Sequence, residues 1–328
     1  MVTDWWQSRK DELLAMAGRK SPLYVFNEEI LNETLFDLLS IDAIDRLFYP
    51  LRANSHPKIL RKAFELDVGF TCTSSDALDG LMEKLPKLAP ERILFFPDNA
   101  SGEDFERAFH GGVNVVVNDL NTLKAWPGIF RNRDIFISRD VGHEQGGNGL
   151  METSIKGFYL CPTIDSPPLW DIDETTVFLD ESLIRFSQGS ILILRNGMSV
   201  GVDHENVIMD IPALADYLYA IKDGCPQAIL WLEVPDMILS SAGVLIATVI
   251  ETCEEAGIRY IRINMDMEGP DYDGLLMSHQ IINLSKPDNE IAEEQSAIEN
   301  TSIMASEISA MISKINQANP VDSSKTEE

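Results

Sequence analysis

The chain has 328 residues, of which 45% are hydrophobic and 8% aromatic, so it can bury a large core. Its 53 acidic and 26 basic side chains give a formal net charge of −27, which argues against nucleic acid and anionic membranes as partners because like charges repel. No apolar run approaches the roughly 18 residues that a membrane span needs, and no secretory signal is visible at the N-terminus. These features predict a cytoplasmic protein.

Short apolar runs rich in β-formers recur through most of the chain, and helical or loop-like segments separate them. This alternation is typical of βα units around a parallel sheet. The eight runs expected to be strands are 47–51, 68–72, 93–96, 113–117, 135–138, 176–179, 191–194 and 229–232. Eight strands with intervening helices predict an α/β fold, a (β/α)8 barrel of the TIM type.

Helix start signals precede several of the intervening segments. Pro57 opens one segment, Ser74 or Ser75 can cap the next, and Asp210 with Pro212 opens another. By contrast, residues 140–174 are rich in Gly and Pro without an amphipathic helix, and residues 180–189 leave room for a turn or two. We therefore expect two eroded barrel units in this region.

The pattern changes after Glu233, where apolar runs at 243–252, 258–265 and 275–284 follow one another without intervening helices. They predict an antiparallel meander, and an isolated strand at 22–27 could pair with it. The expected organisation is a barrel over 30–233 and a small antiparallel β domain built from both chain ends, 1–29 and 234–288. Residues 289–328 are expected to form an amphipathic helix and a disordered acidic tail.

The most specific stretch of the sequence ends the first predicted barrel strand. It contains Tyr49, Arg52, Ala53 and Asn54, and the next strand begins with Gly69 and Phe70 (GF). This pattern resembles the diaminopimelate, ornithine and arginine decarboxylase family, which shares the alanine racemase barrel. There a Tyr-x-x-Lys-Ala-Asn stretch ends the first strand and Gly-Phe-Asp follows. The resemblance spans about residues 22–286 and is strongest to diaminopimelate decarboxylases of lysine biosynthesis.

The resemblance implies a lost cofactor anchor. In the family, the lysine holds pyridoxal phosphate as an imine, and the cofactor takes up the electrons released by decarboxylation. Arg52 occupies the lysine position here. A guanidinium stays protonated at physiological pH and cannot form the imine, so no intact catalytic residue is expected and no cofactor is the first expectation, with pyridoxal phosphate the candidate if there is one.

Other family motifs are altered as well. The sixth-strand His-x-Gly-Ser is matched to DESLIRF at 180–186, which has no histidine; the Glu-Pro-Gly-Arg motif lacks its arginine at Asp236; and Gly269 replaces a substrate-binding arginine. The Cys-Glu-Ser motif of the family's dimer interface has no counterpart. By resemblance, remnants of the cofactor site are Tyr49, Asn54, Arg139, Gly197, Ser199, Gly201 and Glu233, and Tyr272 is a remnant of the substrate site.

Metal and disulfide chemistry have little support in the sequence. The four cysteines form no CxxC pair. His143 with Glu144, and His204 with Glu205, lack the i, i+4 histidine spacing of a helical zinc site. We therefore expect no metal site and reduced thiols.

Three functional hypotheses remain open. The leading one is a pseudoenzyme that binds or regulates an active decarboxylase, as a heterodimer, or forms a homodimer. The second is a divergent amino-acid decarboxylase or other barrel enzyme that holds its ligand without a covalent bond, because several remnants lie at the catalytic end of barrel strands. The third is a decaying duplicate without a selected role.

Overall fold

The computed structural model describes residues 5–18, 20–118, 120–138, 154–160, 191–195, 211–234, 238, 242–255 and 258–264. They fall into two compact units. One contains the described residues from Phe26 to Gly243, and the other contains those up to Val25 and from Val244 onward. The first unit carries the candidate site.

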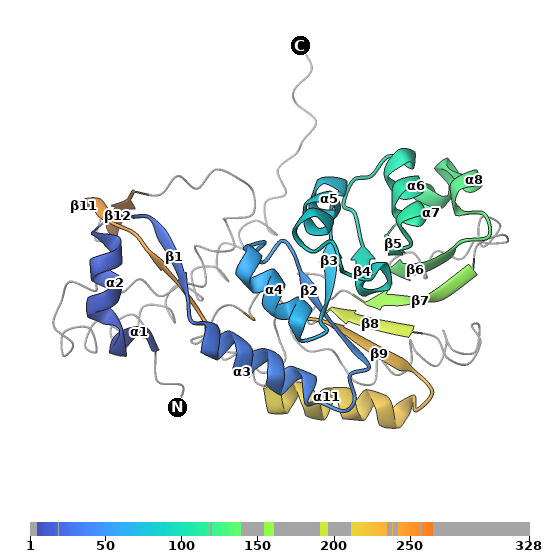
Figure 1. The fold of residues 1–328 in the computed structure, drawn as a ribbon, viewed down its shortest axis with the longest axis horizontal. Helices are drawn as coiled ribbons and strands as arrows, with labels where there is room; N and C mark the ends of the chain where they lie inside the picture. Colours follow the sequence, from blue (N-terminus) through green and yellow to red (C-terminus); the bar gives the residue numbers. More distant parts are fainter. Residues whose placement is uncertain are drawn as a thin grey trace, which may run out of the picture. The chain divides into compact units, whose positions relative to one another are not determined.

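Eight parallel strands of this unit close into a barrel, which confirms the predicted fold class (Figure 1). The last strand closes the barrel on the first, where Leu232 of one is the register partner of Leu47 of the other. In order around the barrel the strands are β2 (Arg46–Pro50), β3 (Gly69–Cys72), β4 (Ile93–Phe95), β5 (Asn114–Val117), β6 (Asp134–Ser138), β7 (Ser154–Leu160), β8 (Ile191–Arg195) and β9 (Ile229–Glu233).

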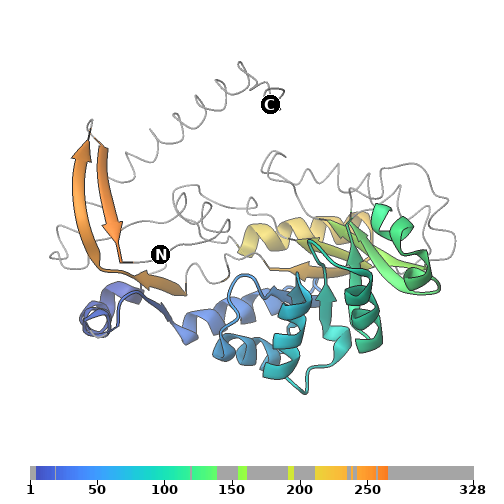
Figure 2. The same ribbon diagram turned by 90° about the horizontal axis from the view of Figure 1, so that it is seen from above.

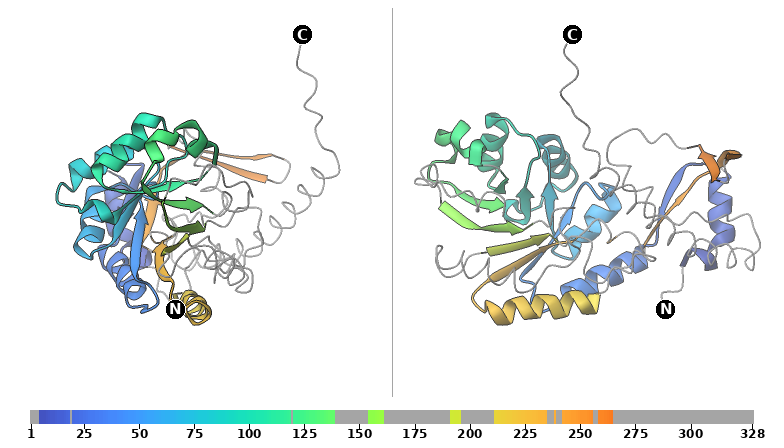
Figure 3. Two further views of the ribbon diagram at one scale, coloured as in Figure 1. Left: turned by 90° about the vertical axis from the view of Figure 1, so that its right-hand side faces the viewer. Right: turned by 180° about the vertical axis from the view of Figure 1, so that it is seen from behind.

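The described helices of this unit lie outside the strands and form an arc around them (Figure 3, left). As predicted, one begins at Pro57 and the next is capped by Ser74, whose hydroxyl accepts from the Ala77 N–H. The helices are α3 (Glu28–Leu39), α4 (Pro57–Glu65), α5 (Ser75–Lys84), α6 (Gly102–Gly111), α7 (Leu120–Ala125), α8 (Pro127–Phe130) and α11 (Ile211–Gly224), with a 3-10 turn over Pro90–Arg92.

Side chains alternate across each barrel strand, so that one set fills the barrel and the other packs under the helices. The interior cluster consists of Phe48, Leu94, Val116, Phe136, Tyr159, Ile191, Ile193 and Trp231. The larger cluster outside the strands includes Leu47, Phe70 and Leu230. This alternation decides which residues at the strand ends point into the barrel mouth.

The sixth barrel strand is not where the sequence pattern placed it. It is β7, whereas the predicted strand at 176–179 and the DESLIRF segment at 180–186 lie outside the described residues. Lys156 and Gly157 interrupt the apolar run of β7, and the pairing of β6 with β7 shifts register between Ile135 and Phe136. The match of DESLIRF to a sixth-strand motif was therefore wrong. The erosion predicted over 140–174 and 180–189 stays a prediction, since those stretches lie outside the described residues apart from β7, which falls within the first.

The second unit contains α1 (Trp5–Ser8), α2 (Lys10–Ala17) and three described strands that follow the barrel. β1 (Leu23–Phe26) pairs with β10 (Gly243–Ile246), so an N-terminal strand does pair with a strand after the barrel, as predicted. β11 (Val249–Glu255) and β12 (Ile258–Ile263) form an antiparallel hairpin (Figure 2).

The prediction of one continuous strand at 243–252 was wrong, because this stretch is divided between β10 and β11, which belong to two separate sheets. The break falls at Thr248, whose N–H donates to Asn264 Oδ1 at 2.7 Å and whose hydroxyl donates to Ser21 Oγ at 2.9 Å. These bonds draw the backbone away from a continuous strand. The run at 275–284 and the helix and tail predicted for 289–328 lie outside the described residues.

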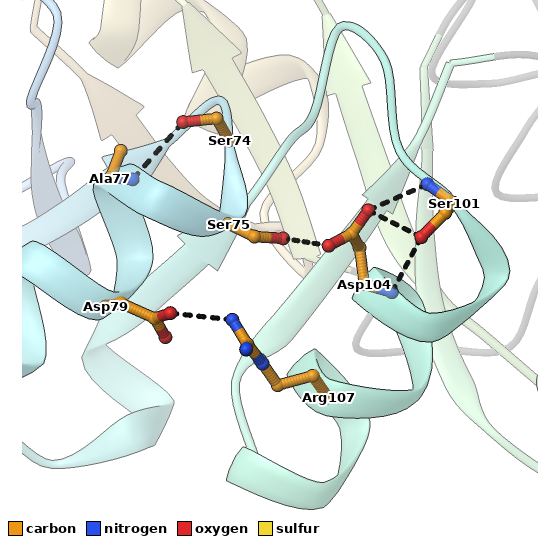
Figure 4. Close-up of polar contacts among 7 residues, drawn as sticks. All are labelled: Ser74, Ser75, Ala77, Asp79, Ser101, Asp104 and Arg107. Carbon is orange, nitrogen blue, oxygen red and sulfur yellow. Dashed lines mark hydrogen bonds and ion pairs between the residues drawn. The ribbon is translucent and has the colours of Figure 1, made fainter.

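A polar cluster joins the N-termini of α5 and α6 beside the barrel (Figure 4). The Ser101 hydroxyl accepts from the Asp104 N–H and the Asp104 carboxylate accepts from the Ser101 N–H, which makes a capping box. The Ser75 hydroxyl donates to the other oxygen of Asp104 at 2.5 Å. Arg107 pairs with Asp79 between the same helices. The bonds from Ser75 and then Ser101 lower the pKa of Asp104.

The replacement Asp104→Ala is expected to destabilise the protein by about 1 kcal/mol at pH 7, the usual size of a lost capping interaction. Folding lowers the pKa of Asp104 from its ordinary value of 3.8. The ionised carboxylate therefore stabilises the fold at pH values above 3.8, and this stabilisation is lost as the pH falls through the lower pKa of the folded protein. Urea unfolding at pH 7 and at pH 3 should therefore give a smaller difference between wild type and variant at pH 3. An equal difference at both pH values would contradict this account, and Lys124→Ala, at an exposed position of α7, is the control.

Candidate functional site at the barrel mouth

The candidate site lies at the carboxyl ends of the barrel strands, where barrel enzymes of this type carry their active sites. Its central residue is Glu233, the last residue of β9, which is 1% exposed. Strand alternation puts Glu233 on the same side of β9 as Trp231, whose ring belongs to the interior cluster. A carboxylate is thus buried inside the mouth.

Two side chains from other strands and one from the turn after β2 lie next to this carboxylate. The Thr71 hydroxyl of β3 donates to Glu233 Oε2 at 2.8 Å, and the Tyr159 hydroxyl of β7 donates to the same oxygen at 2.9 Å. On the other side, Arg52 Nη2 lies 4.0 Å from Glu233 Oε1. Hydroxyl donors and a nearby cation offset the cost of burying a negative charge. These contacts hold the Glu233 carboxyl group in a fixed orientation.

Arg52 lies in the turn that follows β2 and is the most accessible member of the group. Its side chain is 34% exposed, against 2% for Glu233. A guanidinium is a permanent cation with five N–H donors and no lone pair to attack a carbonyl. At this position Arg52 can bind anions and carboxylates, but it cannot be an imine-forming nucleophile.

Tyr49 of β2 and Asn54 of the following loop lie on either side of Arg52 in the sequence. The Tyr49 ring is buried in the cluster outside the strands, edge-on to Phe70 with centroids 6.5 Å apart. Its hydroxyl donates to the Asn54 carbonyl at 3.0 Å, and Asn54 Oδ1 accepts from the His56 N–H at 2.8 Å. These bonds hold the loop between β2 and α4, and so they position the turn of Arg52.

Among the predicted site residues, the structure brings Arg52 and Glu233 together at the mouth and joins Tyr49 to Asn54 by a hydrogen bond. The other predicted residues, Arg139, Gly197, Ser199, Gly201 and Tyr272, lie outside the described residues, as do His143, Glu144, His204 and Glu205. Within the described part of the chain, no group of three His, Cys, Asp or Glu side chains could hold a metal ion. The described helices include none that is long and apolar enough to cross a membrane.

Sequence reasoning missed Thr71 and Tyr159. Thr71 stands where the resemblance has the aspartate of Gly-Phe-Asp, and alternation from Gly69 would have placed it inside the barrel. Cys72, the next residue, faces the outer cluster, where burial raises the pKa of its thiol to about 12. It is a structural thiol. Tyr159 was missed because its strand was not recognised.

Comparison with known proteins supports the fold. No family model and no curated protein sequence matches the chain. Among solved structures, it is similar to AQ1208 from Aquifex aeolicus, with a TM-score of 0.68, 20% identity, and coverage of 84% of this chain and 74% of that one. The arginine decarboxylase of Paramecium bursaria Chlorella virus gives 0.66 and 15%, with coverage of 86% and 83%.

Diaminopimelate decarboxylase from Helicobacter pylori complexed with L-lysine is also similar, with a TM-score of 0.58, 18% identity, and coverage of 75% of this chain and 71% of that one. At these identities the likeness is one of fold. The chain therefore has the barrel fold of the amino-acid decarboxylases.

Among the described residues of the mouth, Arg52 stands at the strand end and cannot hold pyridoxal phosphate as an imine. Such a bond needs a neutral amine at the strand end. The groups found next to Glu233 include two hydroxyls and a guanidinium. No catalytic step through that cofactor follows from these residues.

Proposed function

We propose that this chain is a pseudoenzyme of the decarboxylase fold, which has lost pyridoxal-phosphate-dependent decarboxylation and acts through binding. The observation that supports it is the 4.0 Å approach of Arg52 Nη2 to the buried carboxylate of Glu233. A cation that cannot form an imine lies at the strand end where the resemblance has the cofactor lysine. We also propose that, among these decarboxylases, the chain is most similar to the diaminopimelate decarboxylases.

The proposed role also includes a partner and a location. The chain would form a homodimer, or a heterodimer with an active decarboxylase, in the cytoplasm. Among the described cysteines, Cys72, Cys225 and Cys253, none is in a disulfide, which suits a reducing compartment. The residues of the mouth would then maintain structure: Thr71 and Tyr159 orient Glu233, and Arg52 balances its charge.

The full-length protein is expected to form no imine with pyridoxal phosphate. After incubation with the cofactor, the absorption spectrum should show no imine band. Borohydride reduction followed by peptide mass spectrometry should find no lysine labelled stoichiometrically. The physical reason is that Arg52 has no lone pair to donate. Incubation with diaminopimelate, lysine, ornithine or arginine in the presence of the cofactor should release no carbon dioxide.

The variant Arg52→Lys is the matched comparison. An ammonium placed near the Glu233 carboxylate is favoured in its charged form, so we expect this single change not to restore decarboxylation. Stoichiometric labelling of one lysine in the wild type would overturn the proposal. Recovery of decarboxylation by Arg52→Lys alone would show that the anchor was the only part lost.

A second candidate function is a divergent enzyme that binds its ligand without a covalent bond. It is favoured by the buried Glu233 with its two oriented hydroxyl donors at the catalytic end of a barrel. A thermal-shift screen of amino acids and cofactors distinguishes the two candidates. A ligand that stabilises the wild type but not Glu233→Gln would favour the enzyme.

A further inference from the structure

The opposite, amino-terminal end of the barrel carries two cations over the interior cluster. Arg46 is the first residue of β2, and its guanidinium carbon lies 5.1 Å from the centroid of the Trp231 ring. Lys156 is on β7, with Nζ 5.9 Å from the same ring and 5.6 Å from that of Phe136. Both cations therefore lie against the Trp231 ring, which together with Phe136 forms an aromatic floor at this end of the barrel.

Neutral groups connect these two cations. Arg46 Nη1 donates to the Glu91 carbonyl at 2.8 Å, and Asn114 Nδ2 donates to the same carbonyl at 2.9 Å. Asn114 Oδ1 in turn accepts from Lys156 Nζ at 3.0 Å. The Asn114 side chain is held by a further bond to the Ile93 carbonyl. The cluster is a fixed set of hydrogen bonds, anchored by a residue that is 8% exposed.

Within the described part of the chain, no ion pair joins Arg46 or Lys156 to a carboxylate. Among the described residues, the partners of Arg46 and Lys156 are carbonyl and amide oxygens and aromatic rings. Asp45, which directly precedes Arg46, has its carboxylate engaged by Lys222 and by the Leu230 N–H. An anion that contacts both Arg46 and Lys156 would offset their positive charges.

We propose that the amino-terminal end of the barrel binds a small phosphate-type oxyanion between Arg46 and Lys156. An arginine offers a planar fork of N–H donors to such an anion, and a lysine adds a compact charge. Lys156 is exposed and Arg46 half-buried, so an anion can reach both. The ligand is either inorganic phosphate or the phosphate group of a small metabolite. This site is separate from the mouth and does not depend on the proposed function.

The test uses the full-length protein and inorganic phosphate, with sodium chloride at matched ionic strength as the reference. Phosphate should raise the melting temperature in a saturable way, and calorimetric titration should give a defined affinity. Lys156→Gln and Arg46→Gln should each weaken that affinity at least about tenfold, and Lys156→Arg should retain it. Lys124→Gln, at an exposed position of α7, is the control and should bind like wild type.

The comparison remains decisive if one variant folds poorly, because Lys156→Arg and Lys156→Gln differ in charge at the same position. No saturable effect of phosphate on the wild type would overturn the proposal, as would equal binding by wild type and Lys156→Gln. Titration with glucose 6-phosphate distinguishes the two possible ligands, inorganic phosphate and the phosphate group of a small metabolite. Binding tighter than that of inorganic phosphate would indicate a metabolite, and equal or weaker binding would indicate the free anion.

Discussion

Replacement of Glu233 by alanine is expected to lower the free energy of unfolding by about 3 kcal/mol or more. The carboxylate accepts two hydrogen bonds from the hydroxyls of Thr71 and Tyr159. A hydrogen bond to a charged group is worth about 1.5–3 kcal/mol, and a buried donor left without an acceptor carries a further cost. Tyr159 is 0% exposed and Thr71 is 3% exposed. Water can therefore replace the lost carboxylate only poorly.

The matched variants separate hydrogen bonding from charge. Glu233→Gln keeps an acceptor oxygen on a side chain of similar shape. This variant should therefore lose less stability than Glu233→Ala. Tyr159→Phe should cost about 1.5–3 kcal/mol, and its effect should largely vanish in the Glu233→Ala background because the two residues share one bond. Urea unfolding of all four proteins measures this cycle. Additive effects of Tyr159→Phe and Glu233→Ala would show that the bond contributes little.

Removal of Glu233 has different consequences under the two candidate functions. If the mouth is a structural remnant, Glu233→Gln changes stability and leaves partner binding intact. If the mouth holds a ligand, the same variant abolishes the thermal shift that the ligand produces. Because Arg52 is one-third exposed, it is not left as a buried charge when Glu233 is changed. The stability cost therefore reports mainly on Thr71 and Tyr159.

The sequence allowed most of the barrel to be predicted because its strands are continuous apolar runs. Seven of the eight expected strands overlap observed ones. The exception, β7, has Lys156 directed to the aromatic floor and Gly157 at a close approach, so its pattern is neither continuous nor regularly alternating. The same failure hid Tyr159. Periodicity predicts which positions of an ordinary strand are buried. It fails for β7 because Lys156 and Gly157 depart from the usual alternation.

The candidate site was only half predictable for a related reason. Arg52 and Glu233 occur in stretches that resemble a family pattern, so their pairing at the mouth could be expected. Thr71 carries no signal of its own, since a threonine in a strand is ordinary. Its role depends on the length and direction of the Glu233 side chain from a strand 162 residues away. Such a contact follows from barrel closure and not from local sequence.

Gly157→Ala is expected to cause the largest loss of stability of any single methyl addition at a described glycine. Gly157 is the register partner of Phe136 on β6 and of Ile191 on β8. A Cβ at Gly157 would overlap the backbone carbonyl oxygen of Ile191 and would lie 3.0 Å from Phe136 Cε1. A backbone carbonyl in a ladder cannot move aside as a flexible side chain can. The pairing of β7 with β8 must therefore open, which disrupts barrel closure.

We expect Gly157→Ala to cost more than about 4 kcal/mol, a value reserved for severe packing or backbone defects, or to prevent folding. The control is Gly80→Ala in α5, where the added Cβ meets no atom within 4 Å; this variant should gain about 0.5–1 kcal/mol because alanine favours a helix interior over glycine. Thermal melts and urea titrations compare the two. Near-wild-type stability of Gly157→Ala would mean that β7 does not lie this close to β8, and the Tyr159–Glu233 contact on the same strand would need revision with it.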